Sequence, residues 1–295
     1  MTRLRAVLRA RGVLVADGGW GTMLMRRGLA LGECPERWCL DRPDEVRDVA
    51  RQYVGAGAEV VMTNSFGANR LKLERFGLEA QAAELNEIAA RLSREAAGPE
   101  RFVFGSVGPT GRLLVVGEVT EAALAEAFGE QAAALVAGGV DAILVETMID
   151  VEEARVAVRA ARACAQVPVA CTFTFERSAA GAYHTIMGVA PAAAARAALE
   201  AGADIVGTNC GRGVADMVAI VRTMRAAAPD VPILVQANAG LPDAAGVYPE
   251  TPESMVAHVP ALVRAGAGIV GGCCGTTPAH IRAIRRVVDR IREGR

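Results

Sequence analysis

The chain has 295 residues, enough for two domains or one α/β barrel, and its net charge is only −1, from 32 basic and 33 acidic residues. This balance argues against a nucleic-acid partner, because phosphate binding requires a concentrated positive excess. Hydrophobic residues make up 52% of the chain but aromatic residues only 4%. The core is therefore expected to consist of Ala, Val, Leu and Ile, as in buried parallel strands under alanine-rich helices.

The N-terminal segment, residues 1–9, interrupts its apolar residues with arginine and predicts a short amphipathic helix rather than a secretory leader. No apolar run reaches the roughly 18 residues of a membrane span without charges or helix breakers, so we expect no membrane partner. The seven cysteines are an odd number, which leaves at least one unpaired in any disulfide scheme. A cytoplasmic protein in a reducing compartment is predicted.

Apolar runs of strand length alternate with longer alanine-rich helical segments along the chain, the pattern of successive βα units. Eight strands are predicted, at residues 13–16, 59–63, 102–107, 142–145, 168–173, 204–208, 232–237 and 268–271. The helices that follow them are predicted at residues 43–55, 81–96, 121–137, 151–165, 191–201, 214–227, 252–265 and 278–291.

Four short glycine-containing segments each end a helix and open the next strand, at 56–59, 137–141, 201–204 and 265–268. Glycine at such a point can adopt the left-handed conformation that stops a helix. Eight units without a break in composition predict a single (β/α)8 TIM barrel in one domain over residues 1–295. An open doubly wound sheet is the alternative, but its G-x-G-x-x-G fingerprint does not follow the first strand.

Reactive groups in such a barrel lie at the carboxyl ends of the strands. Cys273 and Cys274 follow the eighth strand and are flanked by glycines. A disulfide between adjacent cysteines would be strained, so a shared metal is the better interpretation. Zinc prefers thiolates, and a catalytic zinc takes three protein ligands and keeps a fourth position open. Cys210, at the end of the sixth strand, is the predicted third ligand.

Three thiolates make an electron-rich zinc site that is poorly suited to hydrolysis and well suited to a fourth thiolate. The metal deprotonates a coordinating thiol and so supplies a nucleophilic sulfur at neutral pH. Alkyl transfer to a substrate thiol is the reaction this predicts. Asp17 and Glu146, both at strand ends, are placed to hold an ammonium group, and the glycine-rich turn at 17–22 offers backbone amides for a carboxylate. An amino acid bearing a thiol fits these groups.

Six segments resemble the zinc-dependent homocysteine S-methyltransferases over nearly the whole chain: residues 17–22, 63–66, 108–111, 146–147, 209–210 and 271–276. This resemblance implies a (β/α)8 barrel in which Cys210, Cys273 and Cys274 bind Zn²⁺. It also implies that Asp17, Gly18 and Glu146 contact homocysteine, which is methylated to methionine.

Asn238 matches an asparagine that, in the homocysteine module of cobalamin-dependent methionine synthase, occupies the fourth zinc position until the substrate displaces it. An amide oxygen is a hard ligand, so weak and reversible binding to zinc is physically sensible. Asn64 has two interpretations, as a cap of the next helix or as a residue of the substrate pocket.

The sequence indicates the methyl donor less directly than it indicates the methyl acceptor. Methionine synthase carries further folate, cobalamin and activation domains, and this chain ends about where its homocysteine module ends. Residues 236–242 resemble that module more than the betaine enzymes, so we expect a methylated corrinoid carried by a separate protein. Residues 33–38 also resemble bacterial betaine-homocysteine methyltransferases. A self-sufficient enzyme using betaine or S-methylmethionine is therefore the alternative, and a redox dithiol protein using Cys273 and Cys274 is a third interpretation.

Several residues have an ordinary structural interpretation beside a functional one. Trp20 and Trp38 either face an onium donor by cation-π contact or pack the barrel mouth. Cys164 and Cys171 are predicted to be buried as small hydrophobic residues. A purely structural zinc site is disfavoured, because the three ligands come from distant strands and no fourth cysteine lies at a strand end.

Overall fold

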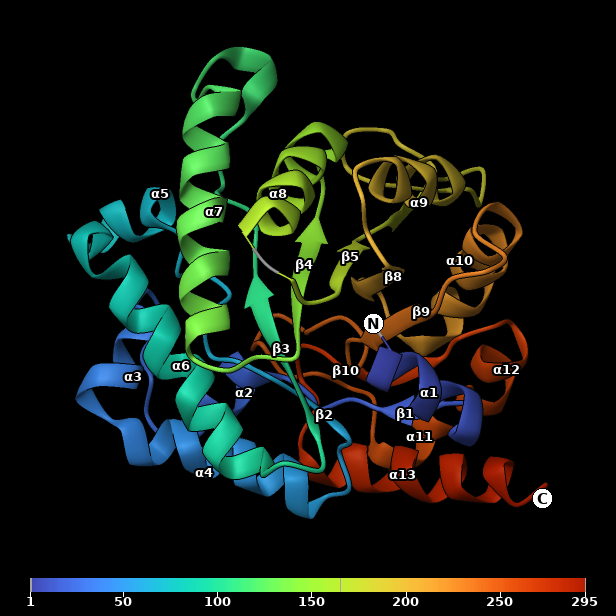
Figure 1. Cartoon of the computed structure of the whole chain (residues 1–295). Coiled ribbons are helices and arrows are strands. Elements are labelled where there is room, and N and C mark those ends of the chain that lie inside the picture. The colour runs from blue at the N-terminus through green and yellow to red at the C-terminus, as the bar shows by residue number, and fades with distance from the viewer. Residues whose placement is uncertain (1, 165, 295) are drawn as a thin grey trace.

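A computed structural model of the protein describes residues 2–164 and 166–294. Eight parallel strands form one sheet in the order β1-β10-β9-β8-β5-β4-β3-β2 (Figure 1). The two edge strands meet at a parallel bridge between Ala16 and Val60, flanked by a hydrogen bond of 2.7 Å from Glu59 N to Val15 O. The sheet is thereby closed into a barrel surrounded by helices, and the predicted (β/α)8 fold is confirmed.

All eight predicted strands are present, with small differences at their ends. They are β1 (Leu14–Val15), β2 (Val60–Met62), β3 (Phe102–Val107), β4 (Ala142–Met148), β5 (Val169–Phe173), β8 (Ile205–Cys210), β9 (Ile233–Ala237) and β10 (Ile269–Gly272). The main helices of the outer layer are α4 (Pro43–Gly55), α6 (Ala82–Ala97), α7 (Glu121–Ala137), α8 (Val151–Cys164), α9 (Pro191–Glu200), α10 (Val214–Ala227) and α13 (Pro278–Arg292). Residue 165, the predicted end of α8, lies outside the described residues.

The helix predicted over 252–265 is wrong as one element, because it is divided into α11 (Pro252–Val256) and α12 (Val259–Arg264). Pro260 lies at the start of the second piece. Its ring nitrogen carries no N–H, so a continuous helix would lose a hydrogen bond there and its ring would clash with the preceding turn.

The inside and the outside of the barrel form separate apolar clusters. Alternate residues of each strand point inward, and they include Leu14, Met62, Phe104 and Leu144. Leu4 and Leu8 of α1 (Thr2–Arg11) pack against this inner cluster. The predicted N-terminal amphipathic helix is present, and it plugs the end of the barrel from which the strands begin.

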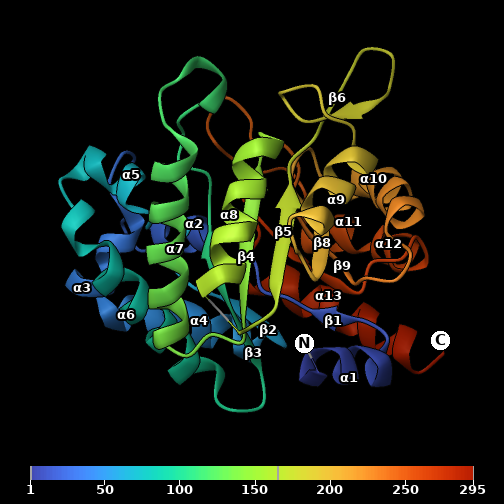
Figure 2. The ribbon, with the colours of Figure 1, turned by 45° about the horizontal axis from the view of Figure 1, so that its top comes forward.

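Several connections at the carboxyl ends of the strands carry structure that was not predicted. They hold α2 (Trp20–Met25), α3 (Trp38–Asp41), α5 (Arg70–Leu73) and the short 3₁₀ turns η1 (Pro35–Arg37), η2 (Glu74–Phe76), η3 (Glu79–Gln81) and η4 (Leu114–Val116). A small hairpin of β6 (Glu176–Arg177) and β7 (Tyr183–His184) projects from the barrel after β5 (Figure 2).

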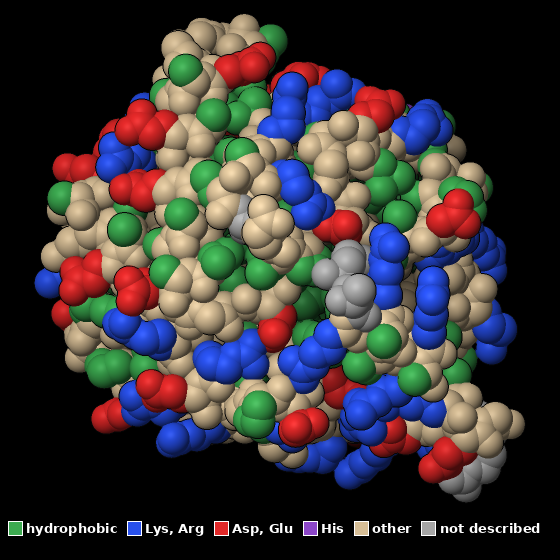
Figure 3. Space-filling view, in the orientation of Figure 1, with side chains coloured by type: hydrophobic (Ala, Val, Ile, Leu, Met, Phe, Trp, Pro, Cys, Tyr) green, Lys and Arg blue, Asp and Glu red, His purple; other side chains and the backbone are tan. Residues whose placement is uncertain are grey.

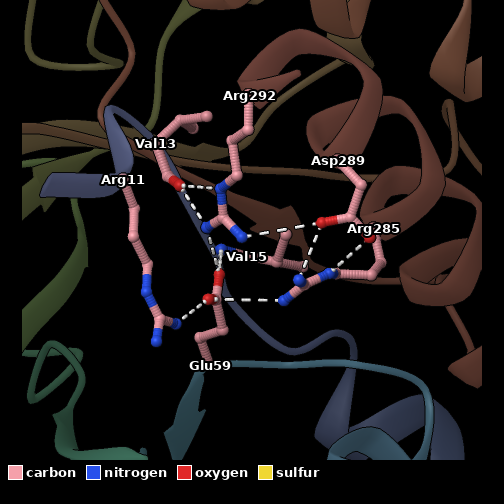
Figure 4. A network of polar contacts seen from close by, with 7 residues as sticks. All are labelled: Arg11, Val13, Val15, Glu59, Arg285, Asp289 and Arg292. Atoms are coloured by element: carbon pink, nitrogen blue, oxygen red, sulfur yellow. Dashed lines mark hydrogen bonds and ion pairs between the residues drawn. The ribbon is translucent and has the colours of Figure 1, made fainter. Parts of the chain in front are cut away.

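Glu59, just before β2, joins the two ends of the chain at the base of the barrel (Figure 4). Its carboxylate accepts hydrogen bonds from Arg292 Nη2 at 2.6 Å, from Arg11 Nη1 at 2.5 Å and from the Val15 N–H at 3.0 Å. Arg285 Nη1 lies 3.3 Å away. Burial opposes ionisation, but these donors outweigh it and hold the pKa of Glu59 below its usual value.

Charged side chains are scattered over the face of the molecule on which α1 lies. Figure 3 shows Lys and Arg side chains gathered where α1 and α13 lie in Figure 1, interspersed with Asp and Glu. Among the described residues, no helix combines the length and apolarity needed to cross a bilayer.

Candidate active site

Three thiols from two strand ends meet at the mouth of the barrel. Cys210 Sγ lies 3.2 Å from Cys273 Sγ and 3.9 Å from Cys274 Sγ, and the last two sulfurs are 3.9 Å apart. Ligands about 2.3 Å from a tetrahedral zinc would be about 3.8 Å from one another, so the donor type and the spacing fit such an ion. All seven cysteines are free, and these three are half-buried. The structure therefore brings Cys210 next to the adjacent pair, and zinc ligation by the three cysteines stays a prediction.

Without a cation, the three thiols share negative charge unequally. Hydrogen bonds from Cys210 and Cys273 to the sulfur of Cys274 lower the pKa of Cys274 and favour its thiolate. The pKa of Cys273 is raised by its contacts with Cys210 and Cys274 and by burial. Three thiolates at this separation therefore need a cation among them, because their mutual repulsion disfavours triple ionisation.

Glycines allow the strand ends to converge on this point. A Cβ on Gly19 would lie 2.5 Å from the carbonyl oxygen of Cys273, and a Cβ on Gly275 would lie 2.2 Å from Cγ of Tyr248. Thr276 fastens the turn, because its Oγ1 accepts from Gly19 N at 2.9 Å and donates to Cys273 O at 2.6 Å. Glycine is thus required for the close approach of the Cys273 backbone to Gly19 and of the Tyr248 ring to Gly275.

Asn238 is hydrogen-bonded to both segments that carry the cysteines. Its Oδ1 accepts from Cys274 N at 3.0 Å, and its Nδ2 donates to Gly211 O at 2.8 Å. The side chain therefore links the two segments that carry the thiols. Its oxygen retains a second lone pair, and zinc ligation by Asn238 stays a prediction.

Glu146 points from the end of β4 into the barrel mouth. The hydroxyl of Ser106 donates to its Oε1, and Asn209 Nδ2 donates to its Oε2 at 3.3 Å. Burial raises the pKa of Glu146 to about 7, against the lowering effect of the Ser106 bond. A cationic group beside this carboxyl would favour its ionised form.

Asp17, at the end of β1, is fully buried. Its Oδ2 accepts from Met62 N at 2.8 Å and from Trp20 Nε1 at 2.9 Å, whereas Oδ1 has no hydrogen-bond partner. Burial raises the pKa of Asp17 to about 7, and the nearby charge of Glu146 adds to this rise. A buried acceptor without a donor is costly, so Oδ1 is suited to a donor that a ligand would supply.

A cavity of about 660 Å³ joins these groups. Gly18, Asn64, Glu146 and the three cysteines all line it. Its walls also include Trp20, Phe66 and Tyr248, and Glu36 contributes a carboxylate. The candidate residues named from the sequence therefore surround one space, apart from Asp17 and Asn238, which lie behind its wall.

Asn64 does not cap the next helix, because Asn69 supplies the cap of α5 through Lys72 N. Its Nδ2 instead donates to Pro35 O at 2.8 Å and holds the 34–39 segment against the cavity.

Trp38 is buried with the Arg42 guanidinium 4.5 Å over its ring, so its packing interpretation is confirmed. Cys171 is buried as predicted, but the prediction for Cys164 is wrong, because it is exposed at the end of α8.

Five polar residues at the site were not assigned from the sequence: Ser106, Thr172, Asn209, Gln236 and Tyr248. The first four lie on barrel strands at positions that continue the inward-facing alternation, so period-two counting from the apolar core would have found them. Tyr248 lies in the long connection after β9, where no such periodicity applies. It faces the thiolate of Cys274, and burial with this contact raises its pKa to about 12.

The sequence profile of the homocysteine S-methyltransferase family matches residues 14–288. The chain belongs to this family. Methionine synthase of Mycobacterium tuberculosis (strain ATCC 25618 / H37Rv) is 35% identical over 312 residues, which cover 99% of this chain and 26% of that protein. Methionine synthase of Mycobacterium leprae (strain TN) is 34% identical, over 97% of this chain and 25% of that protein. The chain thus spans about a quarter of the length of these relatives.

A solved structure also matches nearly the whole of this chain. The metallated form of the homocysteine methyltransferase MmuM from Escherichia coli superimposes with a TM-score of 0.81 and 26% identity, covering 96% of this chain and 99% of that one. The similarity thus extends both to proteins of about four times this length and to a solved chain that is covered almost completely.

Proposed function

We propose that this protein methylates homocysteine to methionine, with Zn²⁺ held by Cys210, Cys273 and Cys274. The observation that carries the proposal is the convergence of three thiols, all within 4.8 Å of one another, on a cavity that the Glu146 carboxyl also lines, with the buried carboxyl of Asp17 behind its wall. Zinc, when bound, supplies the Lewis acidity that keeps a substrate thiol ionised at neutral pH. Such a site needs reduced cysteines, which favours the predicted cytoplasmic location.

The chain's own residues would orient the amino acid. With the substrate sulfur directed to the cysteines, its ammonium group would lie beside Glu146, which lines the cavity, and would face the unpaired Oδ1 of Asp17 behind the wall. Each carboxyl would then gain a charged partner that favours ionisation. The backbone at Gly18 would face the substrate carboxylate, as the family resemblance implies. Asn238 would serve as the weak fourth ligand that homocysteine displaces.

For the methyl donor we favour a methylated corrinoid presented by a separate protein or domain. Nine large hydrophobic side chains are exposed in the described part of the chain, and every one lies in a connection that leaves the carboxyl end of a barrel strand: Met25, Leu31, Phe76, Val115, Val116, Ile186, Met187, Leu241 and Val247. Apolar exposure confined to these connections favours a macromolecular partner over a free small donor. The higher identity to methionine synthases supports the same choice.

A small onium donor such as betaine or S-methylmethionine is the second candidate, and one observation favours it. Trp20, Phe66 and Tyr248 bring three aromatic rings to the cavity wall. Aromatic faces attract such cations by cation-π interaction. The Phe66 ring, however, already has the ammonium of Lys72 4.6 Å from its centroid.

Methionine formation by the purified zinc protein tests the donor. Homocysteine is supplied with methylcobalamin, with betaine or with S-methylmethionine, and methionine is measured over time. Turnover with methylcobalamin and none with the onium compounds supports the proposal. Fast turnover with betaine or S-methylmethionine and none with methylcobalamin would establish the second candidate instead.

A further inference from the structure

Two non-glycine residues in the described part of the chain have positive φ, Thr147 at 60° and Cys210 at 61°. Each directly follows a residue of the barrel mouth, Glu146 on β4 and Asn209 on β8. The left-handed conformation is unfavourable for a β-branched residue such as Thr147, so surrounding contacts must hold it there. The structure identifies the side chain that does so.

Asn209 is fully buried, and its amide uses its whole hydrogen-bonding capacity between β4 and β5. Oδ1 accepts from Thr147 N and from Thr172 Oγ1, both at 2.8 Å. Nδ2 donates to Thr147 Oγ1 at 2.7 Å and to Glu146 Oε2 at 3.3 Å. One side chain thus holds both the main chain at Thr147 and the carboxylate before it.

These contacts coincide with an irregularity in β4. Its pairing with β5 shifts register between Val145 and Met148, so the residues between them form a bulge. Bulges of this kind redirect a side chain near an active site. Here the bulge frees Thr147 N from the β5 ladder to donate to Asn209, while Ser106 fixes the other oxygen of Glu146.

We propose that Asn209 is a positioning residue that fixes the distance between Glu146 and the cysteine cluster, and so sets the length of thiol amino acid that the site accepts. Asn209 immediately precedes Cys210, so one short backbone unit carries both the amide that holds Glu146 and a sulfur of the cluster. A substrate held at its ammonium and at its sulfur must span this fixed gap, which distinguishes homocysteine from the shorter cysteine. The inference rests on the proposed role of Glu146 as the ammonium partner.

Thr172→Val is the most informative variant, because it removes one hydrogen bond to Asn209 without touching the carboxylate or a cysteine. Zinc per chain, the Kd of homocysteine by calorimetry and the Kd of cysteine by competition are measured. We expect zinc to be retained, homocysteine to bind about 3- to 10-fold more weakly, and the preference for homocysteine over cysteine to fall. Thr172→Ser keeps the hydroxyl and should bind homocysteine more tightly than Thr172→Val.

Thr208→Val is the matched control. Thr208 is also a buried threonine, but its hydroxyl contacts Met217 Sδ at 3.4 Å on the helix side of β8. Even if Thr208→Val lowers the stability of the protein, it should leave the dissociation constants of homocysteine and cysteine unchanged. Asn209→Leu, which removes all four bonds, should give a larger loss of selectivity than Thr172→Val if it folds.

The double variant Thr172→Val with Glu146→Gln distinguishes a failure of the positioning role of Asn209 from a failure of the proposed substrate site. If Asn209 acts through Glu146, then Thr172→Val weakens binding far less in the Glu146→Gln background than in the wild type. The inference is overturned if Glu146→Gln weakens homocysteine binding whereas Thr172→Val changes neither affinity nor selectivity, or changes them equally in both backgrounds. Unchanged binding in Glu146→Gln itself would instead refute the proposed substrate site.

Discussion

The carboxylate of Asp17 accepts a hydrogen bond from the indole Nε1 of Trp20 at 2.9 Å, while its other oxygen is buried without a donor. The bond ties the end of β1 to the aromatic wall of the cavity. It also leaves one defined acceptor for a ligand.

Asp17→Asn should weaken homocysteine binding by at least about tenfold, because a charge-assisted hydrogen bond contributes about 1.5 to 3 kcal/mol. The substitution keeps the shape of the side chain and removes the negative charge opposite the ammonium. Calorimetric titration with homocysteine measures the change. Trp20→Phe is the control, since it removes the indole donor but keeps the carboxylate of Asp17 and should give the smaller loss.

Homocysteine affinity should fall as the pH is lowered from about 8 to about 6, because the pKa values of Asp17 and Glu146 are both raised to about 7. Protonation removes the negative charge that would face the substrate ammonium. Calorimetry across this range should give a curve with its midpoint near neutrality in the wild type. A flat profile would show that neither carboxyl titrates in contact with the ligand.

The raised pKa of Asp17 also predicts that the free energy of unfolding changes with pH in the opposite direction to homocysteine affinity. A folded-state pKa above the unfolded value means that the carboxyl of Asp17 stabilises the protein fully at low pH and that this contribution is lost as pH rises through about 7. Asp17→Asn cannot ionise, so its free energy of unfolding should rise relative to wild type between about pH 5 and about pH 8. Urea unfolding of the protein without substrate at both pH values measures the difference.

Glu59→Gln should lower the free energy of unfolding by about 3 kcal/mol at neutral pH, because Arg11, Arg285 and Arg292 would lose their carboxylate partner at the base of the barrel. The pKa of Glu59 is lowered in the folded protein, so its contribution is present above the unfolded pKa and lost in acid. Denaturant unfolding should therefore show a deficit that shrinks as the pH falls. Homocysteine affinity in the folded variant should match wild type, and a loss there would contradict a purely structural role.

The fold was predictable because each barrel strand is a buried apolar run, which the sequence displays directly. Val103 and Phe104, for example, are both buried, one against the helices and one inside the barrel. The division of α11 from α12 was also visible, as Pro260. The β6-β7 hairpin and α2 were not, because they lie in connections where short polar segments carry no periodic signal.

The site residues were predictable where they form an unusual sequence pattern, and less so where they are common polar residues. Adjacent cysteines after a glycine-rich strand are unusual, and Cys210 follows from the ligand count of zinc. Asn209, Ser106 and Thr172 are ordinary polar residues, whose meaning depends on side chains from other strands. Their hydrogen bonds to Glu146 and to one another appear only when the barrel brings these strands together.

Replacing Cys210, Cys273 or Cys274 singly with alanine should reduce bound zinc well below one ion per chain, because two thiolates hold the ion far less firmly than three. Metal analysis after dialysis against a mild chelator gives the stoichiometry. Cys164→Ala is the matched control, since this exposed thiol lies on α8 outside the cluster and its loss should leave zinc content unchanged. Stoichiometric zinc in all three cluster variants would refute the ligand assignment.

The most direct test is X-ray absorption at the zinc edge, recorded on the purified protein before and after homocysteine is added. The proposed site predicts three sulfur neighbours at about 2.3 Å in the free protein and a fourth when homocysteine binds. The lighter ligand that Asn238 is predicted to supply should disappear at the same time. A coordination shell that gains no sulfur on addition of homocysteine would contradict the activation of the substrate thiol at this site.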